Sequence, residues 1–258
     1  MSDPRITPDP ALVTADEPAQ IGVPIVDLLR SPAGPRDRQL LLGEAVTSLG
    51  GDATWRYVRA EKDGYCGHVP TPTLTAPVAP THRVSAPATH AYTQADMKSP
   101  DQMSMSFGSL ISVLDQTGQF ARTVQGYIPL GHLTQVDEVS DDPVEVAELF
   151  LGTPYLWGGN SCWGIDCSGL VQAALLACGI PCPGDSDLQQ SLGAEASDGY
   201  RRNDLLFWKG HVALVCDAET LIHANAASMS TRKEGIAEAI RRIQATGDGP
   251  VTAHRRLL

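Results

Sequence analysis

The sequence is poor in basic residues and lacks a long hydrophobic run. Its 19 lysine and arginine residues are outnumbered by 30 aspartate and glutamate residues, which gives a formal net charge of −11. Nucleic-acid-binding proteins usually carry a basic stripe, and anionic membranes attract basic surfaces. The balance therefore argues against a nucleic-acid or a membrane partner. The apolar stretches also fall short of the ~18 residues that a membrane-spanning helix needs.

The first ten residues lack the basic segment and apolar run of a secretory signal. We therefore expect a cytoplasmic protein with reduced thiols. Six cysteines are present, an even number that would also allow disulfides. The pairs Cys162 with Cys167 and Cys178 with Cys182 are spaced more widely than the pairs that usually bind zinc. We expect neither a metal nor an organic cofactor.

Aromatic residues make up only 5% of the chain, whereas glycine and proline contribute 24 and 19 residues. This composition favours short strands and turns over long helices in much of the chain. Residues 1–20, rich in Pro, Asp and Thr, predict a flexible tail. Residues 21–80 and 81–140 predict two small β-barrels, because both end in a Gly-Tyr pair followed by an apolar-Pro step. Within the first of these, residues 40–49 predict a strand, and Asp63-Gly64 predicts a hairpin turn. Residues 141–258 predict an α+β domain with helices first and an antiparallel sheet afterwards. Its first helix is predicted to have Asp141 or Asp142 as its cap and Pro143 near its first position.

Cys167 lies between Asp166 and Ser168, at the start of an apolar run with helical character. Unpaired backbone N–H groups and the helix dipole at a helix N-terminus favour a thiolate, which is the nucleophilic form of cysteine. The alternative is a small buried hydrophobic residue. The polar, glycine-rich segment around Cys167 favours the reactive interpretation.

Two histidines accompany predicted strands in the same domain. His211 precedes one apolar strand and His223 ends the next, so a short turn would bring both imidazoles together. In that geometry His211 would take the thiol proton, and His223 would fix its tautomer and orientation. Each histidine alone is more often a half-buried structural residue.

Five motifs of this domain resemble, in order and spacing, those of the NlpC-type cysteine peptidases, papain-like endopeptidases of bacterial cell-wall peptides. The resemblance implies that Cys167 is the nucleophile, His211 the base and His223 the orienting residue. It also implies that Tyr155 stabilises the oxyanion. Asn203 departs from the family pattern, which commonly has glycine there. The five motifs are YLWGG (155–159), DCSGL (166–170), NDLLFW (203–208), GHVA (210–213) and IHA (222–224).

The two N-terminal barrels resemble the bacterial SH3-type barrels found in a subset of this family. That subset is similar to γ-D-glutamyl-L-diamino-acid endopeptidases, which require a free N-terminal L-Ala. The resemblance implies that Asp166 and Ser168 hold the substrate's ammonium group, together with Tyr65 and Glu44 of the first barrel. The alternative for these last two is a core tyrosine and a surface glutamate.

The sequence thus predicts a peptidase that hydrolyses the γ-D-Glu–diamino-acid bond of murein-derived peptides during cell-wall recycling. One alternative is an amidase or acyltransferase of the same fold. Another is a non-catalytic protein that binds cell-wall polymer or peptide. The diamino acid and the oligomeric state are not predicted.

Overall fold

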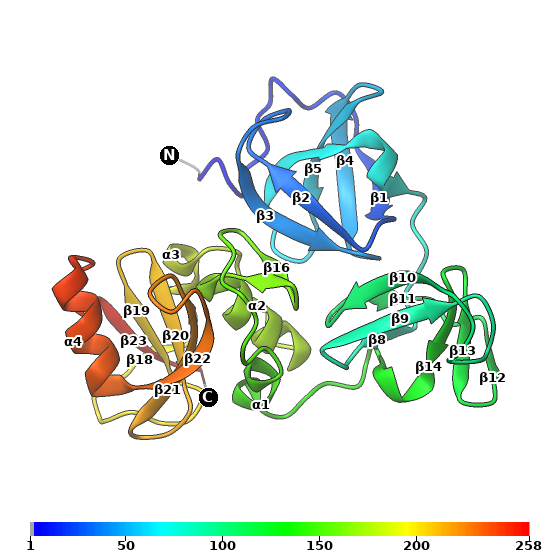
Figure 1. Ribbon diagram of the computed structural model, residues 1–258. Coiled ribbons are helices and arrows are strands. Elements are labelled where there is room, and N and C mark those ends of the chain that lie inside the picture. The colour runs from blue at the N-terminus through cyan, green and yellow to red at the C-terminus, as the bar shows by residue number, and fades with distance from the viewer. Residues whose placement is uncertain (1–2, 258) are drawn as a thin grey trace. The chain divides into compact units, whose positions relative to one another are not determined.

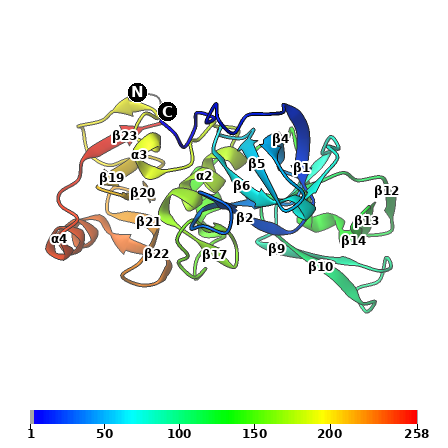
Figure 2. The same cartoon turned by 90° about the horizontal axis from the view of Figure 1, so that it is seen from above.

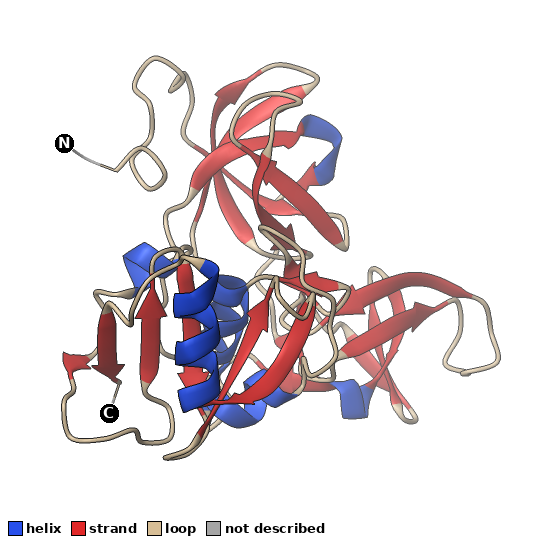
Figure 3. Ribbon diagram, turned by 60° about the vertical axis from the view of Figure 1, so that its left-hand side comes forward, coloured by secondary structure: helices blue, strands red, loops and turns tan. Residues whose placement is uncertain are grey.

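The computed structural model describes residues 3–257, and the chain divides into two compact units, Met1–Glu138 and Val139–Leu258. Strands dominate both units, and the helices, blue in Figure 3, are few and short beside them. The paired strands are antiparallel in all the named sheets, which confirms the predicted class of antiparallel sheets with few helices. Within residues 3–257, none of the helices is long and apolar enough to cross a membrane.

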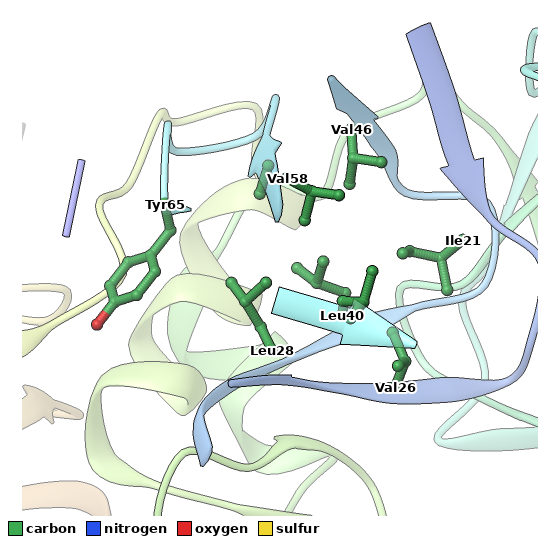
Figure 4. Packing of buried hydrophobic residues seen from close by; sticks show 9 residues of the cluster. Ile21, Val26, Leu28, Leu40, Val46, Val58 and Tyr65 are labelled. Carbon is green, nitrogen blue, oxygen red and sulfur yellow. The ribbon is translucent and has the colours of Figure 1, made fainter. Parts of the chain in front are cut away.

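The N-terminal unit begins with a seven-stranded sheet in the order β3-β2-β6-β5-β4-β1-β7. Alternation sets its inner face: in β2, Val26 and Leu28 point into the core while their neighbours are partly exposed. Figure 4 shows this core, in which Ile21, Val46 and Val58 join them. The strands are β1 (Glu17–Ile21), β2 (Ile25–Leu29), β3 (Arg36–Leu41), β4 (Ala45–Gly51), β5 (Trp55–Ala60), β6 (Cys66–Pro70) and β7 (Leu74–Thr75), with the short helix η1 (Thr71–Thr73) before β7.

Glycine sets two turns of this sheet. Residues 40–49, which the sequence predicts as one strand, form two strands instead, because Gly43 adopts a φ of 79° between β3 and β4. A side chain at Gly43 would also meet the backbone oxygen of Leu110 at 2.3 Å. The hairpin predicted at Asp63 and Gly64 is confirmed: it joins β5 to β6, and Gly64 has a φ of 77°.

The segment before β1 runs along the sheet rather than leaving it. Thr14 donates its backbone N–H to the Leu49 carbonyl at 2.8 Å, and Cys66 donates to the carbonyl of Arg5 at 2.7 Å. Strand β1 then begins at Glu17 and pairs with β4. Residues that the sequence places in a tail thus use their backbone groups to extend the hydrogen bonding of the first β-region.

The rest of the N-terminal unit contains a five-stranded sheet, β10-β9-β14-β13-β12, and a three-stranded sheet, β11-β8-β15. Their shared core includes Val84, Met105 and Ile128, and Leu42 reaches it from the first β-region. These two sheets make up the second β-region of the N-terminal unit. Their elements are β8 (His82–Val84), β9 (Ala88–Tyr92), β10 (Asp101–Ser106), β11 (Leu110–Ile111), β12 (Asp115–Thr117), β13 (Phe120–Thr123), β14 (Gly126–Pro129), η2 (Leu130–His132) and β15 (Leu133–Gln135).

The C-terminal unit is built on a six-stranded sheet in the order β18-β23-β19-β20-β21-β22, most of which can be followed in Figure 2. Helix α4 lies on one face, and helices α1 and α2 lie on the other (Figure 1). Ile236 and Ile243 of α4 pack against Leu206 and Trp208 of the sheet. The strands of this sheet are β18 (Ala194–Glu195), β19 (Leu205–Trp208), β20 (His211–Val215), β21 (Thr220–Asn225), β22 (Ser230–Gly235) and β23 (Ala253–Arg256).

Polar residues set the ends of the helices in this unit. Asp142 caps α1 by accepting a hydrogen bond from the Val144 N–H at 2.9 Å, and Pro143 occupies the first helical position, as predicted. Gly179, with a φ of 72°, follows the end of α2. The remaining elements are α1 (Pro143–Glu148), β16 (Asn160–Ser161), β17 (Gly164–Ile165), α2 (Cys167–Ala177), α3 (Ser186–Gln189) and α4 (Ile236–Thr246).

A buried carboxylate joins β23 to the start of β19. Asp204 accepts hydrogen bonds from His254 Nε2 at 2.6 Å and from Arg256 Nε and Nη2 at 3.0 and 2.9 Å. The Asp204 side chain is only 1% exposed. A carboxylate between a histidine and an arginine therefore holds β23 in the sheet.

Candidate active site

Asp166 organises the turn that carries Cys167. Its Oδ1 accepts from the Gly169 N–H at 2.6 Å and the Ser168 hydroxyl at 3.0 Å, while Oδ2 accepts from the Gly158 N–H at 2.9 Å. The first contact caps α2, and the last ties the helix start to the preceding glycine-rich loop. Cys167 is thus the first residue of a firmly capped helix.

The resting thiol of Cys167 is neutral, contrary to the expectation of a thiolate. Burial, with the nearby negative charge of Asp166, raises the pKa of Cys167 to about 12. Backbone N–H groups at the helix start, together with that of Val212, oppose this shift and do not overcome it. Sγ lies 4.0 Å from the carbonyl oxygen of Gly210, the residue directly before His211.

His211 is neutral as well. Burial lowers its pKa to about 3, and the neighbouring His223 and the positive charge of Arg242 act in the same direction. The site therefore rests with a neutral Cys167 thiol and a neutral His211 imidazole. A proton must move from Cys167 to His211 before the sulfur becomes a strong nucleophile.

His211 begins a hydrogen-bonded chain that runs through two strands and a helix. His211 Nε2 and His223 Nδ1 are 2.9 Å apart, and His223 Nε2 lies 3.0 Å from Glu234 Oε2. Arg242 of α4 then donates from Nε and Nη2 to Glu234 Oε1 and Oε2 at 2.9 and 2.7 Å. The side chains of His223 and Glu234 are 0% and 4% exposed, so water does not compete for these bonds.

The carboxylate of Glu234 determines the tautomers of His223 and His211. Contacts with His223 and Arg242 lower the pKa of Glu234 to about 2, so its oxygens can only accept. His223 therefore carries its proton on Nε2 and accepts at Nδ1 from Nε2–H of His211. His211 Nδ1 is left unprotonated and can take the thiol proton.

Sequence reasoning missed Glu234 and Arg242. Glu234 lies in the polar strand segment TRKEG and Arg242 in an amphipathic helix, patterns that are typical of solvated surfaces. Only the pairing of β21 with β22, which places Glu234 beside the strand of His223, reveals the contact. No signal in the sequence separates these charges from their exposed neighbours.

Tyr155 is placed by backbone contacts close to the start of α2. Its N–H donates to the carbonyl of Met229 at 3.0 Å, and it forms an isolated bridge with Ile165, two residues before Cys167. Burial raises the pKa of Tyr155, and the neighbouring acidic groups Cys167 and Asp166 act in the same direction. The phenol therefore keeps its proton and remains a hydrogen-bond donor.

The structure thus brings Cys167, His211, His223, Tyr155, Asp166 and Ser168 together in the C-terminal unit. Tyr65 and Glu44 belong to the N-terminal unit. Tyr65 packs in the first barrel core, with the Arg38 guanidinium carbon 5.8 Å from its ring centroid.

Glu44 is not the surface residue of the alternative interpretation. Its Oε1 accepts from Lys62 Nζ at 2.7 Å, and its side chain is only 13% exposed. The other carboxylate oxygen, Oε2, is buried without a hydrogen-bond partner in the described part of the chain. A carboxylate oxygen in that state has unused capacity to accept a hydrogen bond.

Within residues 3–257, no group of three or more His, Cys, Asp or Glu side chains is placed to hold a metal ion. The six cysteines are all free.

Two segments of the chain match models of known protein families. Residues 152–242 match the NlpC/P60 family model, and residues 28–74 match the model of the bacterial dipeptidyl-peptidase SH3 domain. The gamma-D-glutamyl-L-lysine dipeptidyl-peptidase of Bacillus subtilis is 29% identical over 213 residues, covering 72% of this chain and 71% of that protein. Dipeptidyl-peptidase 6 of Lysinibacillus sphaericus is 34% identical over 96 residues, but this match spans only 35% of that protein.

A crystal structure of an NlpC/P60 family protein from Bacillus cereus has the same fold. It superposes with a TM-score of 0.79 and 21% identity, covering 94% of this chain and all of the other. The region matched to the family model contains Cys167, both histidines, Glu234 and Arg242.

Proposed function

Because the chain carries an NlpC/P60 peptidase domain behind a bacterial SH3-type region, we propose that it is a cysteine endopeptidase that hydrolyses the γ-D-Glu–diamino-acid bond of murein peptides with a free N-terminal L-Ala. The observation that carries the proposal is the hydrogen-bonded chain from His211 to Glu234, next to a buried thiol at a helix start. This chain leaves Nδ1 of His211 unprotonated, as a general base requires.

The reaction begins with transfer of the Cys167 proton to His211 Nδ1 while Sγ attacks the γ-carbonyl carbon of D-Glu. A C–S bond forms, and the oxyanion accepts hydrogen bonds from the Tyr155 hydroxyl and the backbone N–H of Cys167. As the tetrahedral intermediate collapses, the C–N bond breaks and the imidazolium of His211 protonates the leaving amine. A thioester remains on the enzyme.

Hydrolysis of the thioester restores the site. His211 removes a proton from a water molecule that attacks the carbonyl carbon, the C–S bond breaks, and the sulfur takes the proton back. In both steps His223 and Glu234 stabilise the imidazolium of His211, because His223 Nδ1 accepts its Nε2–H and Glu234 in turn accepts the Nε2–H of His223. Water supplies the second oxygen of the product carboxylate, so the hydrolysis needs no further reactant.

The requirement for a free amine rests on four groups. Asp166, Ser168, Tyr65 and Glu44 are proposed to hold the ammonium of the N-terminal L-Ala. The unpartnered, buried Oε2 of Glu44 supports this proposal, since a carboxylate oxygen in such a place favours a cationic hydrogen-bond donor. A free L-Ala terminus exists only after the peptide has left the glycan, so we assign the enzyme to peptide recycling, with the cytoplasm as its proposed location.

The test is digestion of L-Ala-γ-D-Glu-meso-diaminopimelate by the wild type and by Cys167→Ala. The proposal expects release of diaminopimelate by the wild type alone, and equal turnover by both proteins would refute the assigned nucleophile. N-acetylation of the tripeptide should lower kcat/KM at least about tenfold through loss of the ammonium contact. Equally fast cleavage of the acetylated peptide would refute the amine pocket.

The barrel residues need a matched comparison. Glu44→Gln should raise KM for the free tripeptide and leave the slower cleavage of the acetylated peptide unchanged. Glu61→Gln is the control, because Glu61 lies in the same barrel with a side chain 47% exposed. If the two variants behave alike, Glu44 has no part in substrate binding.

A further inference from the structure

A cavity of about 400 Å³ opens beside His211 within the C-terminal unit. Tyr155 and His211 of the proposed active site are among its lining residues, as is Gly210, whose carbonyl oxygen lies 4.0 Å from Cys167 Sγ. Arg242 also lines it, and Lys209 and Asp248 bring further charges to its walls. In the proposed reaction His211 protonates the leaving amine, so the leaving diamino acid occupies the side of the site on which this cavity lies.

The charged groups of the cavity differ in exposure. Arg242 is 29% exposed and uses Nε and Nη2 to hold Glu234, which ties it to the histidine chain. Lys209 and Asp248 are exposed and form no ion pair within residues 3–257. They therefore offer one positive and one negative charge to a ligand in the cavity.

This pattern matches a ligand with three charges. The leaving residue of a tripeptide carries an α-carboxylate close to the scissile nitrogen, where it would meet Arg242. A distal carbon that carries both a carboxylate and an ammonium group would meet Lys209 and Asp248 with opposite charges. A lysine side chain would place its ammonium beside Asp248 but leave Lys209 without a partner and repelled by a like charge.

On the basis of the proposed function, we infer that this cavity binds the leaving diamino acid and selects one whose distal carbon is zwitterionic, as in diaminopimelate, over lysine. Lys209 is the residue that binds the distal carboxylate and so discriminates between diaminopimelate and lysine. Arg242 serves both substrates, because both have an α-carboxylate. Asp248 also serves both, because both have a distal ammonium.

The experiment compares kcat/KM for L-Ala-γ-D-Glu tripeptides that end in meso-diaminopimelate, in L-lysine, or in diaminopimelate with its distal carboxylate amidated. The wild type should prefer the first peptide about tenfold over the other two, the size of one partly exposed charge-assisted contact. Lys209→Gln should bring that ratio close to one by slowing only the first peptide. Asp248→Asn should slow all three.

Lys233→Gln is the matched control, because Lys233 pairs with Glu148 elsewhere in the same unit and should keep the wild-type ratio. Equal kcat/KM for the three peptides in the wild type, or an unchanged ratio in Lys209→Gln, would overturn the inference and leave the proposed function standing.

If none of the peptides is cleaved, the proposed function fails. The selectivity of the cavity is then tested by binding measurements alone. Cys167→Ala would be titrated with free meso-diaminopimelate and with L-lysine, and followed by NMR. Tighter binding of diaminopimelate that Lys209→Gln removes supports the inference. Equal or undetectable binding of the two amino acids overturns it.

Discussion

Replacing Glu234 by glutamine should change the tautomer of both catalytic imidazoles while preserving the shape of the side chain. The glutamine oxygen would accept from Arg242, and its NH₂ group would then face His223 Nε2 as a donor. His223 would have to carry its proton on Nδ1, and His211 would carry its own on Nδ1 as well. With its Nδ1 protonated, His211 could no longer accept the proton of Cys167 at that atom.

The size of the effect follows from the contacts. In a serine-type triad, the same carboxylate-to-amide change next to the base costs about 10⁴ in kcat. Here the carboxylate is one imidazole further from the base, so we expect kcat to fall about 10²–10³-fold. Glutamine also loses a charge-assisted hydrogen bond, which should lower the free energy of unfolding by about 2–3 kcal/mol.

Asp204→Asn provides a control for the loss of stability. Asp204 is a buried carboxylate held between His254 and Arg256, just as Glu234 is held between His223 and Arg242. Asp204 is not part of the proposed catalytic chain, so its variant should lose similar stability and keep its kcat. Urea unfolding and steady-state cleavage of the tripeptide, measured on both variants, separate the two effects.

Two results would refute this reasoning. Glu234→Gln could retain its full kcat, in which case the carboxylate does not set the tautomers. Alternatively, kcat could fall equally in both variants, in which case the loss comes from general destabilisation.

Three further predictions concern the site. Tyr155→Phe should lower kcat about 10- to 10³-fold with little change in KM, because the oxyanion loses one donor; an unchanged kcat would remove Tyr155 from the mechanism. Asp166→Ala should lower the free energy of unfolding by about 2–4 kcal/mol in urea titrations, because the α2 cap is lost and the Gly158 N–H is left unpaired; a change below about 1 kcal/mol would contradict this network. The pH profile of kcat/KM should fall on the acid side only well below pH 6.5, because burial lowers the pKa of His211 to about 3 and the neutral base survives down to that range. On the alkaline side the profile should follow the substrate's amino group, with a pKa of about 8, rather than the Cys167 thiol, whose pKa is about 12; an acid limb at pH 6.5 would refute the buried, neutral imidazole.

Local sequence signals were enough to predict much of the C-terminal unit. The helix at Cys167 begins at its Asp166 cap, and the strands at His211 and His223 are adjacent and antiparallel, because apolar alternation and short turns encode them. The contact between the two imidazoles follows directly from that pairing. The single strand predicted over residues 40–49 was wrong, because Gly43 in a left-handed conformation ended it.

The remaining features depend on contacts between distant segments. The neutral state of Cys167 could not be predicted, since burial and the charge of Asp166 outweigh the helix N-terminus only in the folded chain. The role of Glu234 could not be predicted from the sequence either, because it depends on contacts with a neighbouring strand and with Arg242 on α4. Residue types predict which groups can react, whereas the protonation states of those groups depend on the packing around them.

The position of β23 in the sheet has a consequence for biosynthesis. This strand lies between β18 and β19, although β20, β21, β22 and α4 all separate it from β19 in the chain. While the ribosome is still making those residues, the β19 edge that carries Leu205 and Phe207 has no partner strand. Strands β19 to β22 can pair from hairpin to hairpin as they emerge, whereas β23 closes the edge by a long-range contact and is expected to join last. Until then the nascent domain exposes an apolar strand edge to other chains. That exposure ends when β23 pairs with β19 and His254 and Arg256 form their hydrogen bonds with Asp204.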